Sequence, residues 1–153
     1  MLLNYNVMAG ICSDIKEVMK TQRIYSVATA SKNGVPNVVP VGMLFVGEDN
    51  KIWIVDNFFN KTLANIKENP EVAIYMWSPE HQGDSYQVKG KATIISSGPD
   101  YEKAVFFAYS KMENAPAKNL IKIDVDEVYF VTPGPNAGKK ICCVNRPLRA
   151  FFF

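Results

Sequence analysis

The sequence has few of the residues that catalytic triads and metal sites require. It contains one histidine, His81, and three cysteines among 153 residues. Cys142 and Cys143 are adjacent, and the chain has no CxxC pair, so we predict neither a disulfide framework nor a zinc site. A Ser-His-Asp or Cys-His triad needs a positioned histidine, whereas His81 lies in a polar segment. Hydrolysis is therefore a poor interpretation of this chain.

Long apolar runs and an excess of one charge are also missing. No apolar run approaches the roughly 20 residues needed to cross a bilayer, and no N-terminal segment has the composition of a signal peptide. Seventeen basic and fifteen acidic residues are interspersed and give a net charge of +2. This balance does not suggest nucleic-acid binding or a polybasic membrane anchor. We therefore expect a cytoplasmic protein with no nucleic-acid partner and no membrane contact, folded as one domain over residues 1–153.

What the sequence does contain is a series of short segments rich in β-branched and aromatic residues. Six of them are predicted to be strands: 24–30, 38–46, 51–56, 72–77, 85–97 and 120–131. Asn33-Gly34 is typical of a tight hairpin turn between the first two strands. Pro40 must lie on an edge strand or at a bulge, and Gly90 indicates a bend or bulge. Local hairpins dominate this order, which favours a mainly β, antiparallel, closed or nearly closed barrel.

Three short helices are predicted between the strands. The first covers 14–22 with Ser13 as its N-cap, and the third covers 101–112 after Pro99 at the first helical position. The second begins at Lys61 and ends before Pro70. Regular structure is expected to end at Pro133-Gly134-Pro135, which leaves 136–153 as a C-terminal tail.

The start of the second helix is a candidate anion site. Asn60 is a suitable N-cap, and Lys61 and Thr62 add an ammonium group and a hydroxyl at the end where helical N–H groups are unpaired. The helix dipole is positive at this end, so a phosphate is a fitting ligand. The spacing alone leaves open an ordinary capped surface helix with a solvated lysine.

Several fragments, in this order and spacing, carry a resemblance to a known family. They are residues 27–29, 36–42, 60–66, 69–70, 86–90 and 131–134. The chain resembles the pyridoxamine 5′-phosphate oxidase-like FMN-binding split barrels, and within that fold it is more similar to small FMN-binding proteins than to true pyridoxamine phosphate oxidases. The resemblance implies an antiparallel six-stranded split β-barrel with short helices, which forms a homodimer with FMN at the subunit interface.

The resemblance also implies which residues contact FMN. Lys61 and Thr62, next to Asn60, match the residues that hold the phosphate. The positions that match the lining of the flavin ring are Val41, Gly42, Met43, Asp56 and Asn57, with Gln87 near the ring. Asp56 and Asn57 also fit as turn residues, and Gln87 also fits as an ordinary polar-face residue. Phe58-Phe59 fit either as a cover for the flavin or as a dimer contact.

The C-terminus departs from the family pattern. True oxidases carry arginine and histidine in a C-terminal substrate-phosphate segment, whereas 142–153 contains no histidine. We therefore expect an FMN-dependent oxidoreductase or electron carrier that does not oxidise vitamin B6, with the redox chemistry supplied by the cofactor. The alternatives are a barrel that binds F420 or haem in the same cleft, and a cofactor-free barrel that binds a partner.

Overall fold

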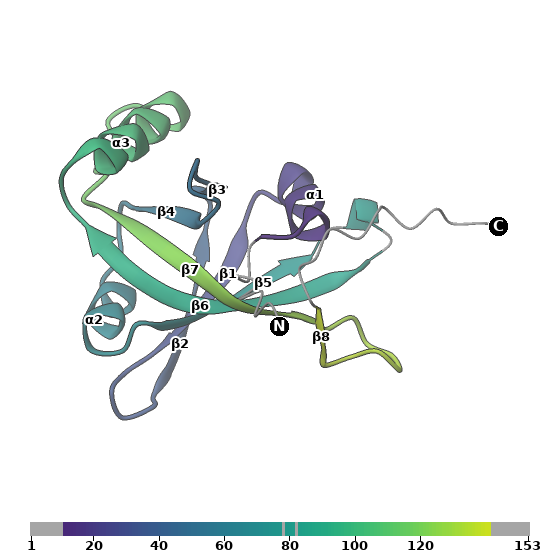
Figure 1. Ribbon diagram of the computed structural model, residues 1–153. Helices are drawn as coiled ribbons and strands as arrows, with labels where there is room; N and C mark the ends of the chain where they lie inside the picture. Colours follow the sequence, from purple (N-terminus) through teal and green to yellow (C-terminus); the bar gives the residue numbers. More distant parts are fainter. Residues whose placement is uncertain (1–10, 78, 82, 142–153) are drawn as a thin grey trace, which may run out of the picture.

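The computed structural model describes residues 11–77, 79–81 and 83–141 (Figure 1). Cys142, Cys143 and the three closing phenylalanines lie outside the described residues. The elements are α1 (Ser13–Thr21), β1 (Tyr25–Ala30), β2 (Pro36–Val41), β3 (Leu44–Val46), β4 (Ile52–Asp56), α2 (Lys61–Glu68), β5 (Glu71–Trp77), the 3-10 helix η1 (Pro79–His81), β6 (Ser85–Ile95), α3 (Pro99–Lys111), β7 (Asn119–Phe130) and β8 (Lys139–Ile141). No helix in these ranges is long and apolar enough to cross a membrane.

The strands form one antiparallel sheet in the order β2-β1-β5-β6-β7-β4-β3, and β8 pairs with β7. The two edge strands β2 and β3 run in the same direction and are separated in sequence by only Gly42 and Met43. Such a short link requires the sheet to curl so that its two edge strands come close at Gly42 and Met43, and Figure 1 shows this curled sheet. The mainly β, antiparallel barrel-like fold predicted from the sequence is therefore confirmed.

The strand count of six is wrong, because the part of the chain that the structure describes contains eight strands. The predicted strand 38–46 is divided at Gly42 and Met43, where the chain leaves the β1 edge and joins β4. The second addition is β8, which lies in the predicted tail. It has three residues, two of them exposed lysines, so it is too short for any alternation to be visible in the sequence.

Two backbone predictions are confirmed. Pro40 lies in β2, opposite Ser26 of β1. Because β2 is an edge strand, the N–H that proline lacks is not needed for pairing with a strand on its other side. The β6–β7 register shifts between Lys89 and Gly90, as expected for a bulge. A Cβ atom at Gly90 would lie 2.2 Å from the carbonyl oxygen of Asp124, so a larger residue would push the two strands apart.

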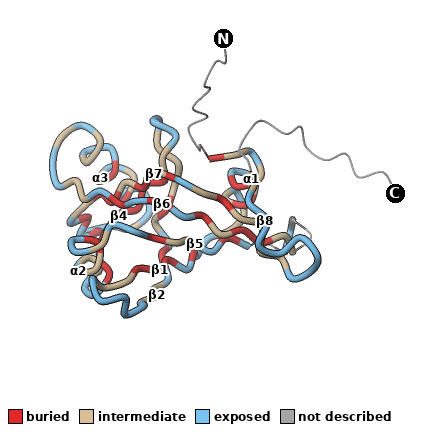
Figure 2. Tube along the Cα trace, turned by 60° about the horizontal axis from the view of Figure 1, so that its bottom comes forward, coloured by how far each residue is buried: buried red, intermediate tan, exposed pale blue. Residues whose placement is uncertain are grey.

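The side chains of β4 divide the apolar interior into two clusters. Ile52 and Ile54 face the barrel interior, whereas Trp53 and Val55 pack under α3 with Leu120. All five residues of β4 are therefore buried, and Figure 2 shows that buried residues elsewhere also concentrate on the strands. Burial on both faces makes β4 a rigid support for the residues that follow it.

The helices lie close to the predicted positions, but two caps differ. Cys12, not Ser13, occupies the N-cap position of α1, and no side chain caps that helix. Asn60 is at the N-cap position of α2, yet its side chain makes no capping hydrogen bond. Pro99 begins α3, as predicted.

Candidate functional site

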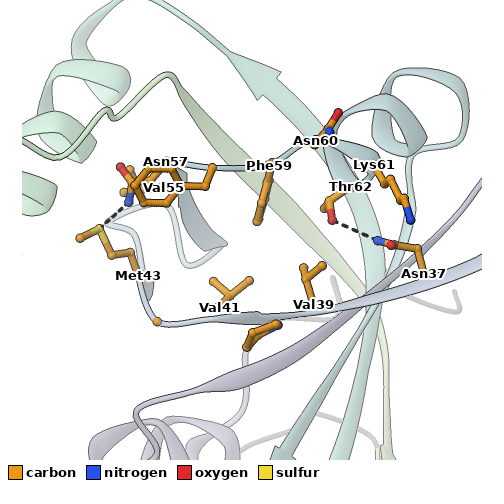
Figure 3. Close-up of a pocket in the computed structure, with 13 residues that line it drawn as sticks. Asn37, Val39, Val41, Met43, Val55, Asn57, Phe59, Asn60, Lys61 and Thr62 are labelled. Atoms are coloured by element: carbon orange, nitrogen blue, oxygen red, sulfur yellow. Dashed lines mark hydrogen bonds between the residues drawn. The ribbon is translucent and has the colours of Figure 1, made fainter.

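A cavity of about 490 Å³ lies where β2, the loop after β4 and the start of α2 meet (Figure 3). This volume is typical of small-molecule sites, which span about 300–1,000 Å³. The lining residues are Asn37, Val39, Pro40, Val41, Gly42, Met43, Val55, Asn57, Phe58, Phe59, Asn60, Lys61 and Thr62.

The middle of the cavity is apolar because β2 presents alternate residues to it. Strand side chains alternate between faces, so Val39 and Val41 lie on the same face as Asn37. Figure 3 shows Val39, Val41 and Phe59 between two polar ends. We call these the Lys61 end (Asn37, Asn60, Lys61 and Thr62) and the Asn57 end (Met43 and Asn57).

At the Lys61 end, a hydrogen-bond network orients a buried hydroxyl. Asn37 Nδ2 donates to Thr62 Oγ1 at 3.1 Å and to Thr29 Oγ1 at 3.3 Å, and Asn65 Nδ2 also donates to Thr29 at 3.0 Å. Thr62 is 1% exposed. Among the described residues the Thr62 hydroxyl only accepts, so its own hydrogen remains available to a ligand in the cavity.

The start of α2 adds further hydrogen-bond donors to the same end. The helix's first backbone bond runs from the Ala64 N–H to the Asn60 carbonyl at 3.0 Å, so the preceding amides have no partner within the helix. Asn60 does not cap these amides, and exposed Lys61 makes no ion pair with a described residue. Amides, ammonium and hydroxyl together form a site that favours an anion.

At the Asn57 end, one side-chain amide joins the cavity to the segment after α3. Asn57 Oδ1 accepts from the Ala117 N–H at 2.9 Å, and Asn57 Nδ2 donates to Met43 Sδ at 3.1 Å. The Met43 carbonyl in turn accepts from the Val55 N–H at 3.0 Å, which fixes the backbone at this end.

Asp56 supports the cavity wall without lining the cavity. It is fully buried, and its carboxylate accepts from the Phe59 N–H at 2.8 Å and from Asn119 Nδ2 at 2.8 Å. The Lys118 ammonium lies 4.0 Å away and is half exposed, so this ion pair is weak. The two hydrogen bonds hold the loop that carries Asn57 to Phe59 against β7.

The structure brings together seven of the nine predicted site residues. Those that line the cavity are Val41, Gly42, Met43, Asn57, Asn60, Lys61 and Thr62. Asp56 lies behind the wall, and Gln87 lies on β6 opposite Tyr75 and Tyr129, away from the lining. Sequence reasoning missed Asn37, Val39, Pro40 and Val55, although alternation along 37–41 was a signal for the first two.

The comparisons with known proteins agree with this architecture. The sequence model of a family described as pyridoxamine 5'-phosphate oxidase matches residues 13–132. An uncharacterised protein of Methanocaldococcus jannaschii is 36% identical over 130 residues, which cover 82% of this chain and 86% of that protein. The solved structure of HupZ from Group A Streptococcus has a TM-score of 0.71 and 28% identity, over 84% of this chain and 99% of that one.

Other solved structures share the fold at lower identity. An FMN-binding protein of Syntrophomonas wolfei has a TM-score of 0.65 and 18% identity, over 74% of this chain and 80% of that one. The haem storage protein HutZ of Vibrio cholerae has a TM-score of 0.64 and 14% identity, over 76% of this chain and 92% of that one. The structure of an F420 reductase has a TM-score of 0.57 and 20% identity, over 74% of this chain and 94% of that one. Proteins with this fold are thus named for different cofactors.

Proposed function

The chain belongs to the pyridoxamine 5′-phosphate oxidase family, and we propose that it is an FMN-binding flavoprotein, an FMN-dependent oxidoreductase or electron carrier. The observation that carries this proposal is the cavity with an anion-binding Lys61 end and an apolar middle. FMN has matching parts, since a phosphate ends a polar ribityl chain that leads to a flat aromatic ring. In this proposal Lys61, Thr62 and the first amides of α2 hold the phosphate.

The charge of the lining supports a phosphate ligand. None of the described residues that line the cavity is acidic, and Lys61 is the one charged side chain among them. A bound phosphate would therefore meet donors and a positive charge without a nearby carboxylate to repel it. Val39, Val41 and Phe59 offer the apolar surface against which the ring would pack.

The chain's own residues would then bind and orient the cofactor. Among the described residues that line the cavity there is no histidine, cysteine, aspartate or glutamate, so this part of the wall offers Lys61 as its one acid or base. FMN when bound supplies hydride or single-electron transfer. The protein would position the ring and exclude water from one of its faces.

We propose a homodimer in which a second copy covers the open side of the cavity. Phe58 lines the cavity and is 75% exposed, and Pro40, another lining residue, is also exposed. Exposed aromatic surface of this kind is typical of protein interfaces. Phe58→Asp should shift the mass measured by light scattering from dimer to monomer, whereas Phe106→Asp, at an equally exposed site on α3, should leave the mass unchanged. A Phe58→Asp protein that keeps the dimer mass would place the interface elsewhere.

FMN fits this cavity better than haem does. Haem iron is usually held by histidine, cysteine or tyrosine, and none of these is among the described residues that line the cavity. F420 carries phosphate as well, so the Lys61 end alone does not separate it from FMN. The remaining alternative is a barrel without a cofactor that binds a partner.

The experiment that tests the proposal is the visible absorbance spectrum of the purified protein. The cofactor would then be released by heat and identified by mass. A yellow protein that releases FMN is the expected result. A colourless protein that also fails to bind added FMN would contradict the proposal and favour the partner-binding barrel.

A further inference from the structure

We propose that Asn57 selects the ring of the ligand by donating a hydrogen bond from Nδ2 to a ring nitrogen or a carbonyl oxygen. This ring atom takes the place of Met43 Sδ as the acceptor of the Asn57 hydrogen bond. This inference rests on the proposed function, because it concerns a flavin bound in the same cavity. It assigns to one side chain a role that the phosphate contacts at the Lys61 end do not supply.

The first step is the orientation of the Asn57 amide. The Ala117 N–H can only donate, and Ala117 is 2% exposed, so this N–H needs a protein acceptor. The atom facing it at 2.9 Å must therefore be Oδ1. Nδ2 then necessarily points to the other side, where Met43 Sδ lies at 3.1 Å.

The second step is the weakness of the present acceptor. A thioether sulfur accepts hydrogen bonds poorly compared with a carbonyl oxygen or an aromatic ring nitrogen. Asn57 Nδ2 is thus a donor whose partner is easily displaced by a better acceptor. Both Asn57 and Met43 line the cavity, so a ligand that fills it reaches this donor.

The third step is the mobility of the Met43 side chain. The Met43 backbone is held by the hydrogen bond from Val55, but its side chain has three rotatable bonds. The sulfur can swing aside while the backbone stays in place. Exchange of one acceptor for another therefore requires no rearrangement of β3 or β4.

The fourth step is the place of this donor in the cavity. Figure 3 shows Asn57 and Met43 at one end and Asn37, Lys61 and Thr62 at the other. If the phosphate binds at the Lys61 end, the opposite end receives the ring. The ring of FMN carries nitrogen and carbonyl acceptors, whereas a purely hydrocarbon ring would leave Asn57 with the sulfur alone.

The test uses Asn57→Asp, which keeps an oxygen for the Ala117 N–H and nearly the same shape but removes the NH2 donor. Binding of FMN and of riboflavin would be measured by quenching of flavin fluorescence. We expect both ligands to bind about fivefold to tenfold more weakly than to the wild type, since one hydrogen bond of this kind has been lost. The equal loss is the key result, because the two ligands differ only at the phosphate.

Two controls separate the donor from the shape of the pair. Met43→Leu removes the competing sulfur at similar volume, so flavin should bind more tightly than to the wild type. Repeating the Asn57→Asp titration with 5-deaza-FMN identifies the acceptor. A loss confined to FMN assigns it to the ring nitrogen N5, and a loss shared with 5-deaza-FMN assigns it to N1 or a carbonyl oxygen.

The inference can fail separately from the proposed function. Suppose that the wild-type protein binds FMN. Asn57 is then not the selecting donor if Asn57→Asp binds riboflavin as tightly as the wild type does. The same conclusion follows if Met43→Leu weakens flavin binding as much as Asn57→Asp does. If the wild type binds no flavin, the proposed function itself is wrong. If Asn57→Asp does not fold, NMR of the wild-type protein is used instead. The signal followed is that of the Asn57 side-chain amide. That signal should shift when riboflavin is added, and an unshifted signal with riboflavin bound would overturn the inference.

Discussion

The two ends of the cavity are built in opposite ways. The Lys61 end comes mainly from three consecutive residues, 60–62, at the start of one helix, and a single strand residue, Asn37, completes it. The Asn57 end depends on a hydrogen bond to Ala117, which lies 60 residues further along the chain. One end is thus local in sequence, and the other is made only when the barrel has closed.

The two ends would therefore contribute differently to the binding of a ligand. In the proposed function, charge and helical amides at the Lys61 end would attract any phosphorylated ligand and so supply affinity with little selectivity. Under the same proposal, a single amide held in a fixed orientation at the Asn57 end would distinguish ligands by where they carry an acceptor. Breaking each end separately should therefore change different properties.

The largest effect is expected for Asp56→Ala, which removes the carboxylate that holds the loop from Asn57 to Phe59. The Phe59 N–H and the Asn119 amide would lose their buried acceptor, and we expect the free energy of unfolding to fall by about 2–4 kcal/mol. FMN and riboflavin should both bind more weakly, because the loop from Asn57 to Phe59 loses its support. Urea unfolding and flavin titration measure the two effects. Full stability in this variant would show that the loop is held by other contacts.

The next effect isolates the Lys61 end. Lys61→Ala should weaken FMN binding by about 10- to 100-fold, the range expected for one charge-assisted hydrogen bond, while riboflavin affinity stays unchanged. Lys67→Ala is the matched control, since this lysine is exposed on the last turn of the same helix. Equal losses for FMN and riboflavin would mean that Lys61 does not contact the phosphate.

The smallest effect concerns the support of α3, which precedes the segment that holds Asn57. Lys122 Nζ lies 2.6 Å from Asp49 Oδ2 and 2.7 Å from Asp100 Oδ2. Burial opposes the charge of Asp49, but hydrogen bonds from Lys122 and then Trp53 outweigh it and lower the Asp49 pKa. The carboxylate form therefore stabilises the fold fully above the unfolded pKa of about 3.9, and this stabilisation is lost as the pH falls through the lower folded pKa.

Asp49→Asn tests this pH dependence. The difference in unfolding free energy between wild type and variant should be greatest near neutral pH and should shrink as the pH falls below about 4. Chemical unfolding at several pH values measures it. A difference that stays constant down to strongly acid pH would mean that the charge of Asp49 contributes nothing.

Features encoded by neighbouring residues could be predicted from the sequence. The start of α2 at Lys61 depends on residues within one helical turn, and the bulge at Gly90 depends on the absence of one side chain. Asn37 was missed because its role needs Thr62, 25 residues away, to lie across the cavity. Its place on the inward face of β2 was visible, but not what it would face.

Contacts between distant strands could not be predicted in the same way. The pairing of β4 with β7 brings Asn119 to Asp56, which turns a predicted cavity residue into a support behind the wall. Gln87 was assigned by resemblance alone, and its strand places it between Tyr75 and Tyr129, away from the cavity lining. A strand residue's distance from a site depends on the curl of the whole sheet, and no local pattern encodes it.

The most direct test of the central claim is a side-by-side measurement of the wild-type dissociation constants for FMN and riboflavin. If the Lys61 end holds a phosphate, FMN should bind at least about tenfold more tightly, because riboflavin lacks the group that this end recognises. Equal affinities would contradict the assignment of the two ends, and no binding of either ligand would contradict the flavin site itself.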